Sequence, residues 1–404
     1  MSCLRPLMLG FGTVAALVGV EGVDRPEIAV GGFGLVPMAN LVHADGTSEW
    51  HPKALLGASW NSNVYGRESS PTSDVVGRGI AGLEWRWRAA PAHLVRADAE
   101  LEHQQYASES ALDLTGGRAA VEWAREGPRL TTNVDARIAR NQDPLIESGE
   151  LIVRDEGDVE AAAQWNTLTS RFNGRLFASN VDYREGGRFF NENQRDFVRY
   201  GTTLGYGLIR ARDSLIFADL RIDRIAYSEN TRYADSSGAR LLGGWRGLIG
   251  VRATLEAGLG VDHRSYGDGA GMPGATTTRP AANLELRWPW EQGSEIRARI
   301  ESEVIDAASG SGGWSYGGSL DGRYRLRINS HLFGGAGLTR IEGDPDVPGG
   351  TDQQRSILSM EAGIAYFLRD GIGSRLRVEF TDSSSSDDVT YQRVILALDF
   401  AIVL

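Results

Sequence analysis

Apolar and polar residues alternate along most of the chain from about residue 52 onward, in segments of roughly 10 to 14 residues. In residues 249–262, every odd position is apolar and every even position is polar or glycine. The same period recurs in 95–102, 296–304 and 375–380. A period of two places successive side chains on opposite faces of a strand, so the pattern predicts an all-β chain whose strands have one apolar and one polar face.

Two kinds of link join the predicted strands, and they alternate along the chain. The short links are 89–92, 126–128, 168–170, 210–212, 247–248, 291–293, 329–330 and 369–372. The longer links are 66–73, 141–156, 185–195, 228–237, 267–278, 307–313, 343–354 and 383–388, with a shorter one at 106–110. A soluble antiparallel sheet also alternates, but short turns on one side and long loops on the other are typical of outer-membrane barrels. We therefore predict an antiparallel up-and-down transmembrane β-barrel of about eighteen strands, with sixteen as the alternative, and with its short turns in the periplasm.

The tryptophans agree with a membrane location. Most lie close to the predicted short turns, where an aromatic belt would meet the membrane interface: Trp85, Trp87, Trp123, Trp165, Trp245, Trp288 and Trp290. No uninterrupted apolar run of about 18 residues occurs beyond the N-terminal region, which excludes a helical membrane protein.

The first 44 residues predict a signal peptide. Arg5 precedes an apolar run at 7–20, and a second apolar stretch at 28–38 leads to the small residue Ala44. Either a long signal or a translation start downstream of Met1 would explain the two stretches, and an uncleaved membrane anchor is the alternative. We predict a signal peptide over 1–44, a barrel over 45–404, and a location in the bacterial outer membrane, with outer-membrane lipid as a partner.

The polar face of the predicted strands carries many charges of both signs. Facing a lumen, these side chains could stiffen the wall through hydrogen-bonded ladders or contact a hydrated substrate. The candidates for lumen-lining positions are Glu84, Arg86, Arg96, Asp98, Glu100, Asp135, Arg137, Asp219, Arg221, Asp223, Arg252, Glu256, Glu285, Arg287, Arg297, Arg299, Glu301, Glu303, Asp321, Arg323, Arg325, Arg375, Arg377 and Glu379.

Composition limits the chemistry. The net charge of -11 argues against a nucleic-acid partner, and the single cysteine, Cys3, lies within the predicted signal. His103 and His263 fall near outer strand ends without a serine motif, so we predict no catalytic site, no cofactor and no metal site. Arginines gather at the predicted short turns, where they could reach lipid headgroups or form a basic entrance for an anionic polymer or a periplasmic partner.

The segment Leu55-Leu56-Gly57-Ala58-Ser59-Trp60-Asn61-Ser62-Asn63-Val64-Tyr65, followed by the Ser/Asp-rich residues 69–74, resembles the opening of the "putative β-barrel porin 2" family. Members of that family are frequently associated with exopolysaccharide secretion. The resemblance implies a conduit for exopolysaccharide or capsular polysaccharide that works with a periplasmic polysaccharide-export protein. It implies no catalytic residues.

A passive porin for small solutes is the alternative function. Such a porin often folds a long loop into its lumen, and residues 141–156 are the longest candidate for that loop. A structural or adhesive barrel and an outer-membrane enzyme are further alternatives. The sequence does not separate these functions, because all of them share the same alternating strands.

Overall fold

The computed structural model describes the chain in thirteen stretches: 41–42, 48–90, 92–144, 151–184, 196–211, 214–228, 234–268, 274–291, 293–305, 313–344, 354–369, 371–386 and 390–403. Almost all of these residues are in strands. The strands are β1 (Leu41–Val42), β2 (Ser48–Asn61), β3 (Asp74–Ala90), β4 (His93–Tyr106), β5 (Leu114–Glu126), β6 (Leu130–Pro144), β7 (Leu151–Asn166), β8 (Ser170–Tyr183), β9 (Phe197–Ala211), β10 (Ser214–Tyr227), β11 (Ser236–Ile249), β12 (Ala253–Tyr266), β13 (Thr276–Glu291), β14 (Ser294–Ile305), β15 (Gly313–Arg327), β16 (Ser330–Gly343), β17 (Gln354–Arg369), β18 (Ile372–Ser385) and β19 (Tyr391–Val403).

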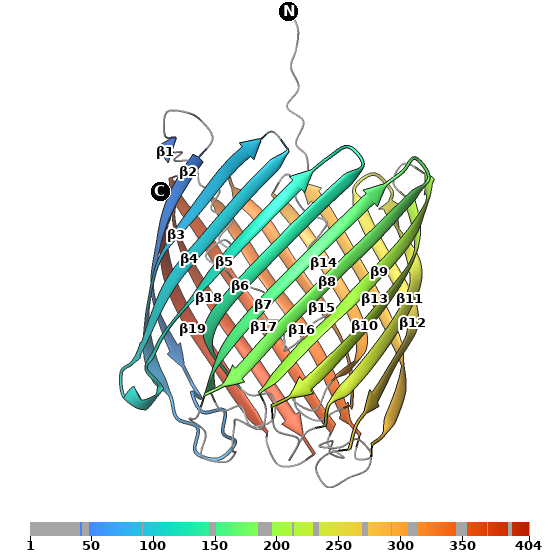
Figure 1. Cartoon of the computed structure of the whole chain (residues 1–404). Helices are drawn as coiled ribbons and strands as arrows, with labels where there is room; N and C mark the ends of the chain where they lie inside the picture. Colours follow the sequence, from blue (N-terminus) through green and yellow to red (C-terminus); the bar gives the residue numbers. More distant parts are fainter. Residues whose placement is uncertain are drawn as a thin grey trace, which may run out of the picture.

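The strands β2 to β19 form one closed antiparallel ring of eighteen. Each pairs with the next strand in sequence, and β19 closes the ring by pairing with β2 from Ile395 opposite Asn61 to Val403 opposite Lys53. Figure 1 shows the tilted strands arranged as a closed barrel, with the C-terminus and β1 at the end of the short turns. Closure gives every strand two partners and removes free edges, which a membrane requires. The predicted barrel and strand number are confirmed.

β1 is a short addition to the ring. Leu41 and Val42 pair with Trp50 and Glu49 of β2, next to the stretch of β2 that β19 covers. β1 falls within the predicted signal peptide, whose other residues lie outside the described stretches. Cleavage after residue 44 therefore stays a prediction.

The link between β4 and β5 contains a single turn of 3-10 helix, Ser110–Leu112. No helix in the described stretches is long and apolar enough to cross a membrane.

Two predicted links differ from the structure. The turn expected at 247–248 occurs at 250–252, where Gly250 adopts a φ of 65°. The long loop expected at 141–156 is wrong: β6 and β7 stay paired in register from Asn141 opposite Arg154 to Pro144 opposite Leu151. Only 145–150 lie between these strands, and they are outside the described residues. Most of residues 141–156, the segment expected to fold into the pore, therefore belong to strands of the barrel wall.

The outward face of the ring is apolar. Large apolar side chains such as Leu56, Leu101 and Ile138 remain exposed there, as expected for a surface that meets lipid. The seven tryptophans predicted near the short turns all lie on this face in the last residues of their strands. They form the periplasmic part of an aromatic belt.

The segment that carries the family resemblance fastens the first loop to the last strand. The buried Asn63 side chain donates to the carbonyl groups of Arg67 (2.8 Å) and Gln392 (3.1 Å) and accepts from the amide of Arg67 (3.0 Å). Its neighbour Val64 is fully buried against Val76 and Tyr106. Asn63 and Val64 are therefore structural residues at the seam where the barrel closes.

Candidate functional site

The polar face of the strands is the inner one. Lys53 of β2 reaches Glu100 of β4 at 2.8 Å, although β3 lies between them. Arg240 of β11 reaches Glu303 of β14 at 3.1 Å across two intervening strands. Side chains converge on the concave face of a closed sheet and diverge on its convex face, so these residues project into the lumen.

All but one of the predicted lumen residues lie in this inward phase. They are Glu84 and Arg86 on β3; Arg96, Asp98 and Glu100 on β4; Asp135 and Arg137 on β6; Asp219, Arg221 and Asp223 on β10; Glu256 on β12; Glu285 and Arg287 on β13; Arg297, Arg299, Glu301 and Glu303 on β14; Asp321, Arg323 and Arg325 on β15; and Arg375, Arg377 and Glu379 on β18.

Arg252 departs from the prediction. It lies in the turn between β11 and β12, is exposed, and donates to the carbonyl of Trp290 on β13. The apolar–polar alternation of the sequence runs on through residues 250–252, but these residues form a turn. β11 ends at Ile249, and Val251 is 93% exposed. Arg252 therefore belongs to the rim of the short-turn end.

One network of ion pairs covers the inner face of β2 to β5. Lys53 binds both Asp98 and Glu100, and Arg118 binds the same two carboxylates, at 3.7 Å and 2.9 Å respectively. Arg78 makes a bidentate pair with Glu102, at 2.7 and 3.0 Å. Two cations sharing two carboxylates across four strands tie these strands together.

A second network covers β8 to β12. Asp223 accepts from Arg199 (3.1 Å) and Arg264 (2.8 Å), and all three side chains are buried. The guanidinium groups of Arg199 and Arg221 also lie 5.9 and 5.3 Å from the centre of the Phe177 ring. Burial with paired charges gives this part of the wall a structural role.

Smaller pairs continue around the ring. Arg297 donates to Glu285 (2.8 Å), Arg287 to Glu295 (3.2 Å) and Arg375 to Asp399 (3.1 Å). Several partners in these networks were absent from the predicted set, namely Lys53, Arg78, Glu102, Arg118, Arg199, Arg264, Glu295 and Asp399. All of them share the inward phase, so a stricter application of the period would have found them.

A row of carboxylates lies on one side of the lumen. Glu122, Asp135 and Glu160 are directly opposite one another in register on β5, β6 and β7. Each is four to six residues from the short-turn end of its strand. Arg175 of β8 pairs with Glu160 at 2.5 Å, and Asn133 donates to Asp135, so two of the three carboxylates have a partner that offsets their mutual repulsion.

Arginines occupy the other side of the lumen at a similar height. Arg299 on β14 and Arg323 on β15 are five and four residues from the short-turn ends of their strands. Neither forms an ion pair within the described stretches. In a ring of eighteen, β15 lies half-way round from β6. At this level the lumen therefore carries arginines without an ion pair on one side and a carboxylate row, partly paired through Arg175, on the other.

The candidate catalytic histidines lie outside the lumen. His103 and His263 are on the outward face, and their Nδ1 atoms contact the hydroxyls of Thr115 (2.9 Å) and Thr278 (2.8 Å). Within the described stretches, no group of three or more His, Cys, Asp or Glu side chains is arranged to hold a metal ion.

A closed ring with a lipid-facing apolar surface and a charged interior defines a porin-like β-barrel of the bacterial outer membrane. The chain belongs to the family described as "Putative beta-barrel porin 2", which matches residues 50–402.

Among solved structures, the chain is similar to the FrpB iron transporter from Neisseria meningitidis (F3-3 variant), with 10% identity and a TM-score of 0.48 over 83% of this chain and 62% of that one. It is also similar to the outer membrane protein opdK from Pseudomonas aeruginosa, with 12% identity and a TM-score of 0.46 over 88% and 99%. A third similar structure is a BenF-like porin from Pseudomonas fluorescens Pf-5. The two chains share 9% identity and a TM-score of 0.47 over 88% of this chain and 99% of the porin. The chain thus spans less than two thirds of FrpB. No curated protein matches it.

Proposed function

We propose that the protein is a passive diffusion porin for small hydrophilic solutes. The observation that supports this most directly is the lumen wall, with its carboxylate row on β5 to β7 and its arginines on β14 and β15. A ring of 16 to 18 strands leaves space for an aqueous channel after its side chains are placed. Polar walls of both signs hydrate that channel and favour charged or dipolar solutes over apolar ones.

The family match is consistent with a porin and identifies no cargo. The resemblance noted in the sequence would also suit polysaccharide export with a periplasmic partner, but no contact in the described lumen distinguishes a polymer from a small solute. Export therefore remains a prediction that rests on the resemblance alone.

Single-channel conductance in planar bilayers tests the porin proposal. We expect stepwise conductance that grows with salt concentration, together with swelling of proteoliposomes in small sugars. A correctly folded barrel that conducts no ions in lipid would overturn the proposal.

Deletion of the gene separates the two functions. Slower uptake of small solutes with unchanged surface polysaccharide would support the porin. Loss of surface polysaccharide with unchanged uptake would instead support export and refute the porin.

A further inference from the structure

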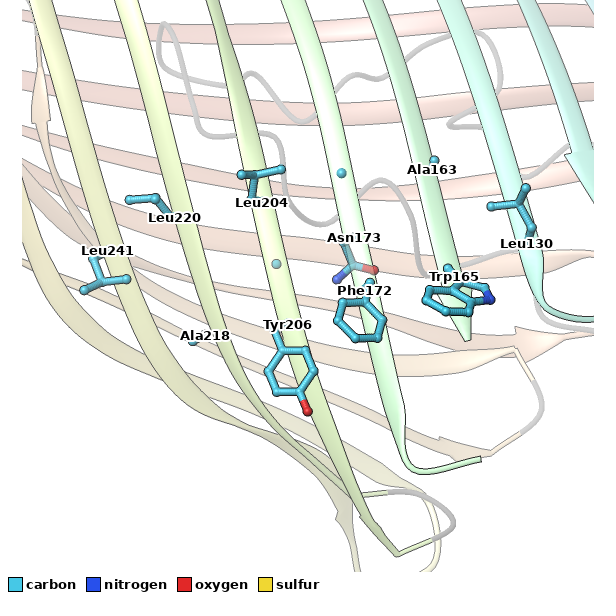
Figure 2. Close-up of a pocket in the computed structure, with 12 residues that line it drawn as sticks. Leu130, Ala163, Trp165, Phe172, Asn173, Leu204, Tyr206, Ala218, Leu220 and Leu241 are labelled. Atoms are coloured by element: carbon cyan, nitrogen blue, oxygen red, sulfur yellow. The ribbon is translucent and has the colours of Figure 1, made fainter. Parts of the chain in front are cut away.

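A hollow interrupts the outward surface of β6 to β11. It is open toward the lipid and has a volume of about 540 Å³, and Figure 2 shows the side chains around it. Its lining is almost entirely apolar: Leu130, Ala163, Trp165, Phe172, Asn173, Gly174, Leu204, Gly205, Tyr206, Ala218, Leu220 and Leu241. We call it the outer groove.

Small residues create the outer groove. On the outward face, Ala163 of β7, Gly174 of β8 and Ala218 of β10 carry little or no side chain. Larger residues surround them, so the wall is locally thinner.

Three aromatic rings mark one end of the groove. The ring centres of Trp165 and Phe172 are 5.4 Å apart, and those of Phe172 and Tyr206 are 5.0 Å apart. Trp165 and Phe172 flank the short turn between β7 and β8, so this end lies at the periplasmic interface of the membrane. The leucines Leu204, Leu220 and Leu241 lie farther along their strands, toward the membrane centre.

Two arginines stand beyond the rings. Arg129 directly precedes β6, and Arg210 follows Tyr206 on the same face of β9. Both are exposed, and neither forms an ion pair within the described stretches. This places positive charge at the level of the headgroups, next to an apolar hollow that runs into the bilayer.

We propose that the outer groove binds one acyl chain of a phospholipid from the periplasmic leaflet, with the phosphate of that lipid near Arg129 and Arg210. The aromatic rings contact the chain where it leaves the headgroup, and the leucines contact it deeper in the membrane. The acyl chain is in apolar surroundings both in the bilayer and in the groove, so the hydrophobic effect does not drive binding. Binding comes from close packing of the chain in the groove and from the attraction between the lipid phosphate and the two arginines.

A second copy of the barrel fits the groove less well. The outer walls of two barrels are both convex. The wall of a second barrel would therefore span the groove without entering it, and lipid would still have to fill the space. A flexible chain, by contrast, can follow a narrow hollow with a glycine and alanine floor.

Two glycines provide a matched pair of variants. Gly174 lies in the groove and Gly157 lies outside it, both on the outward face of neighbouring strands. An added Cβ at either position meets no atom within 4 Å, so neither substitution creates a clash. Gly174→Leu should occupy part of the groove, whereas Gly157→Leu adds the same side chain elsewhere on the lipid-facing wall.

Native mass spectrometry of the full barrel titrated with phosphatidylglycerol tests the proposal. We expect wild type and Gly157→Leu to retain one lipid, and Gly174→Leu to bind it several-fold more weakly, because the leucine side chain takes the place of acyl-chain carbons and removes their packing contacts. Equal lipid retention by Gly174→Leu and Gly157→Leu, in barrels that both show the folded gel mobility, overturns the proposal.

The double variant Arg129→Gln/Arg210→Gln tests the headgroup contact. It should weaken phosphatidylglycerol binding and leave the binding of uncharged diacylglycerol unchanged. Loss of a dimer in Gly174→Leu with unchanged lipid binding would assign the groove to a second copy and refute the lipid proposal.

Discussion

Neutralising the unpaired lumen arginines should make the channel more selective for cations. The variant Arg299→Gln/Arg323→Gln removes two positive charges from the inner faces of β14 and β15. No described carboxylate forms an ion pair with either arginine, so the variant breaks no salt bridge in the wall. The change should therefore act on permeating ions and leave the stability of the barrel nearly unaltered.

The size of the effect follows from Coulomb's law. A charge about 10 Å from a guanidinium interacts with it by ~0.4 kcal/mol in water, and screening leaves ~0.1 kcal/mol at 0.15 M salt and ~0.3 kcal/mol at 0.01 M. Two arginines double these interaction energies. They attract the anion and repel the cation by the same amount, so the energy difference between the two ions is twice as large again. The permeability ratio of anion to cation should then fall ~2-fold at 0.15 M and ~7-fold at 0.01 M.

Reversal potentials in a potassium chloride gradient across planar bilayers measure this ratio. Arg340→Gln is the matched control, because Arg340 lies on the outward face of β16 and pairs there with Glu342. The variant Glu122→Gln/Asp135→Asn/Glu160→Gln should shift the ratio in the opposite direction, since it removes the carboxylate row.

The reasoning fails if Arg299→Gln/Arg323→Gln conducts like wild type and has the same reversal potential at low and high salt. Such a result would mean that permeating ions do not pass the level of these arginines. A shift of equal size in Arg340→Gln would also refute it, because a charge on the lipid-facing wall would then act as strongly as one in the lumen.

Three further predictions concern the stability of the barrel, measured as the temperature at which it loses its folded gel mobility or as urea unfolding in lipid vesicles. Gly371→Ala should strongly destabilise the barrel, because Gly371 has a φ of 77° and an added Cβ would lie 2.1 Å from the carbonyl oxygen of Val403. Gly250→Ala is the control: Gly250 has a φ of 65°, but an added Cβ would meet no atom within 4 Å, so the substitution should cost only about 1 kcal/mol. Lys53→Gln should cost about 1 to 3 kcal/mol, because it leaves the buried carboxylate of Glu100 and the half-buried carboxylate of Asp98 with Arg118 as their remaining cation, and Lys53→Arg should restore most of the loss. Asn63→Ala should cost about 1 to 3 kcal/mol by leaving two backbone carbonyls without a donor, whereas Ser69→Ala, in the same exposed loop, should be neutral.

The sequence was sufficient to predict the faces of the strands because a period of two is fixed by the backbone itself. It was not sufficient to predict where strands end. Above the apolar band both faces of a strand can be polar, and Arg140 and Asp155 show this: they form a bidentate ion pair on the outward face of β6 and β7, at 2.6 and 2.9 Å. Apolar alternation stops there while the strand pairing continues, so residues 141–156 had the composition of a loop.

The choice of ion-pair partners was also beyond the sequence. Pairing in the lumen depends on the stagger between strands and on side chains that reach over an intervening strand. Lys53 meets Asp98 and Glu100 only because β2 and β4 curve toward each other. The outer groove required the same information, since Gly174 and Gly157 are equivalent in the pattern and only the register of neighbouring strands places one of them in the hollow.

The position of residues 55–65 explains what the resemblance found in the sequence can support. Asn63 and Val64 anchor the first loop against the last strand, and both are buried, so they offer almost no surface to a solute in the lumen. Similarity in this segment therefore reports a shared way of closing the barrel. Cargo is determined by the inward-facing residues, and lipid contacts by the outward-facing ones, which alternate with them along every strand. Because the two faces can be altered independently, ion selectivity and lipid retention should respond to different substitutions in the same barrel.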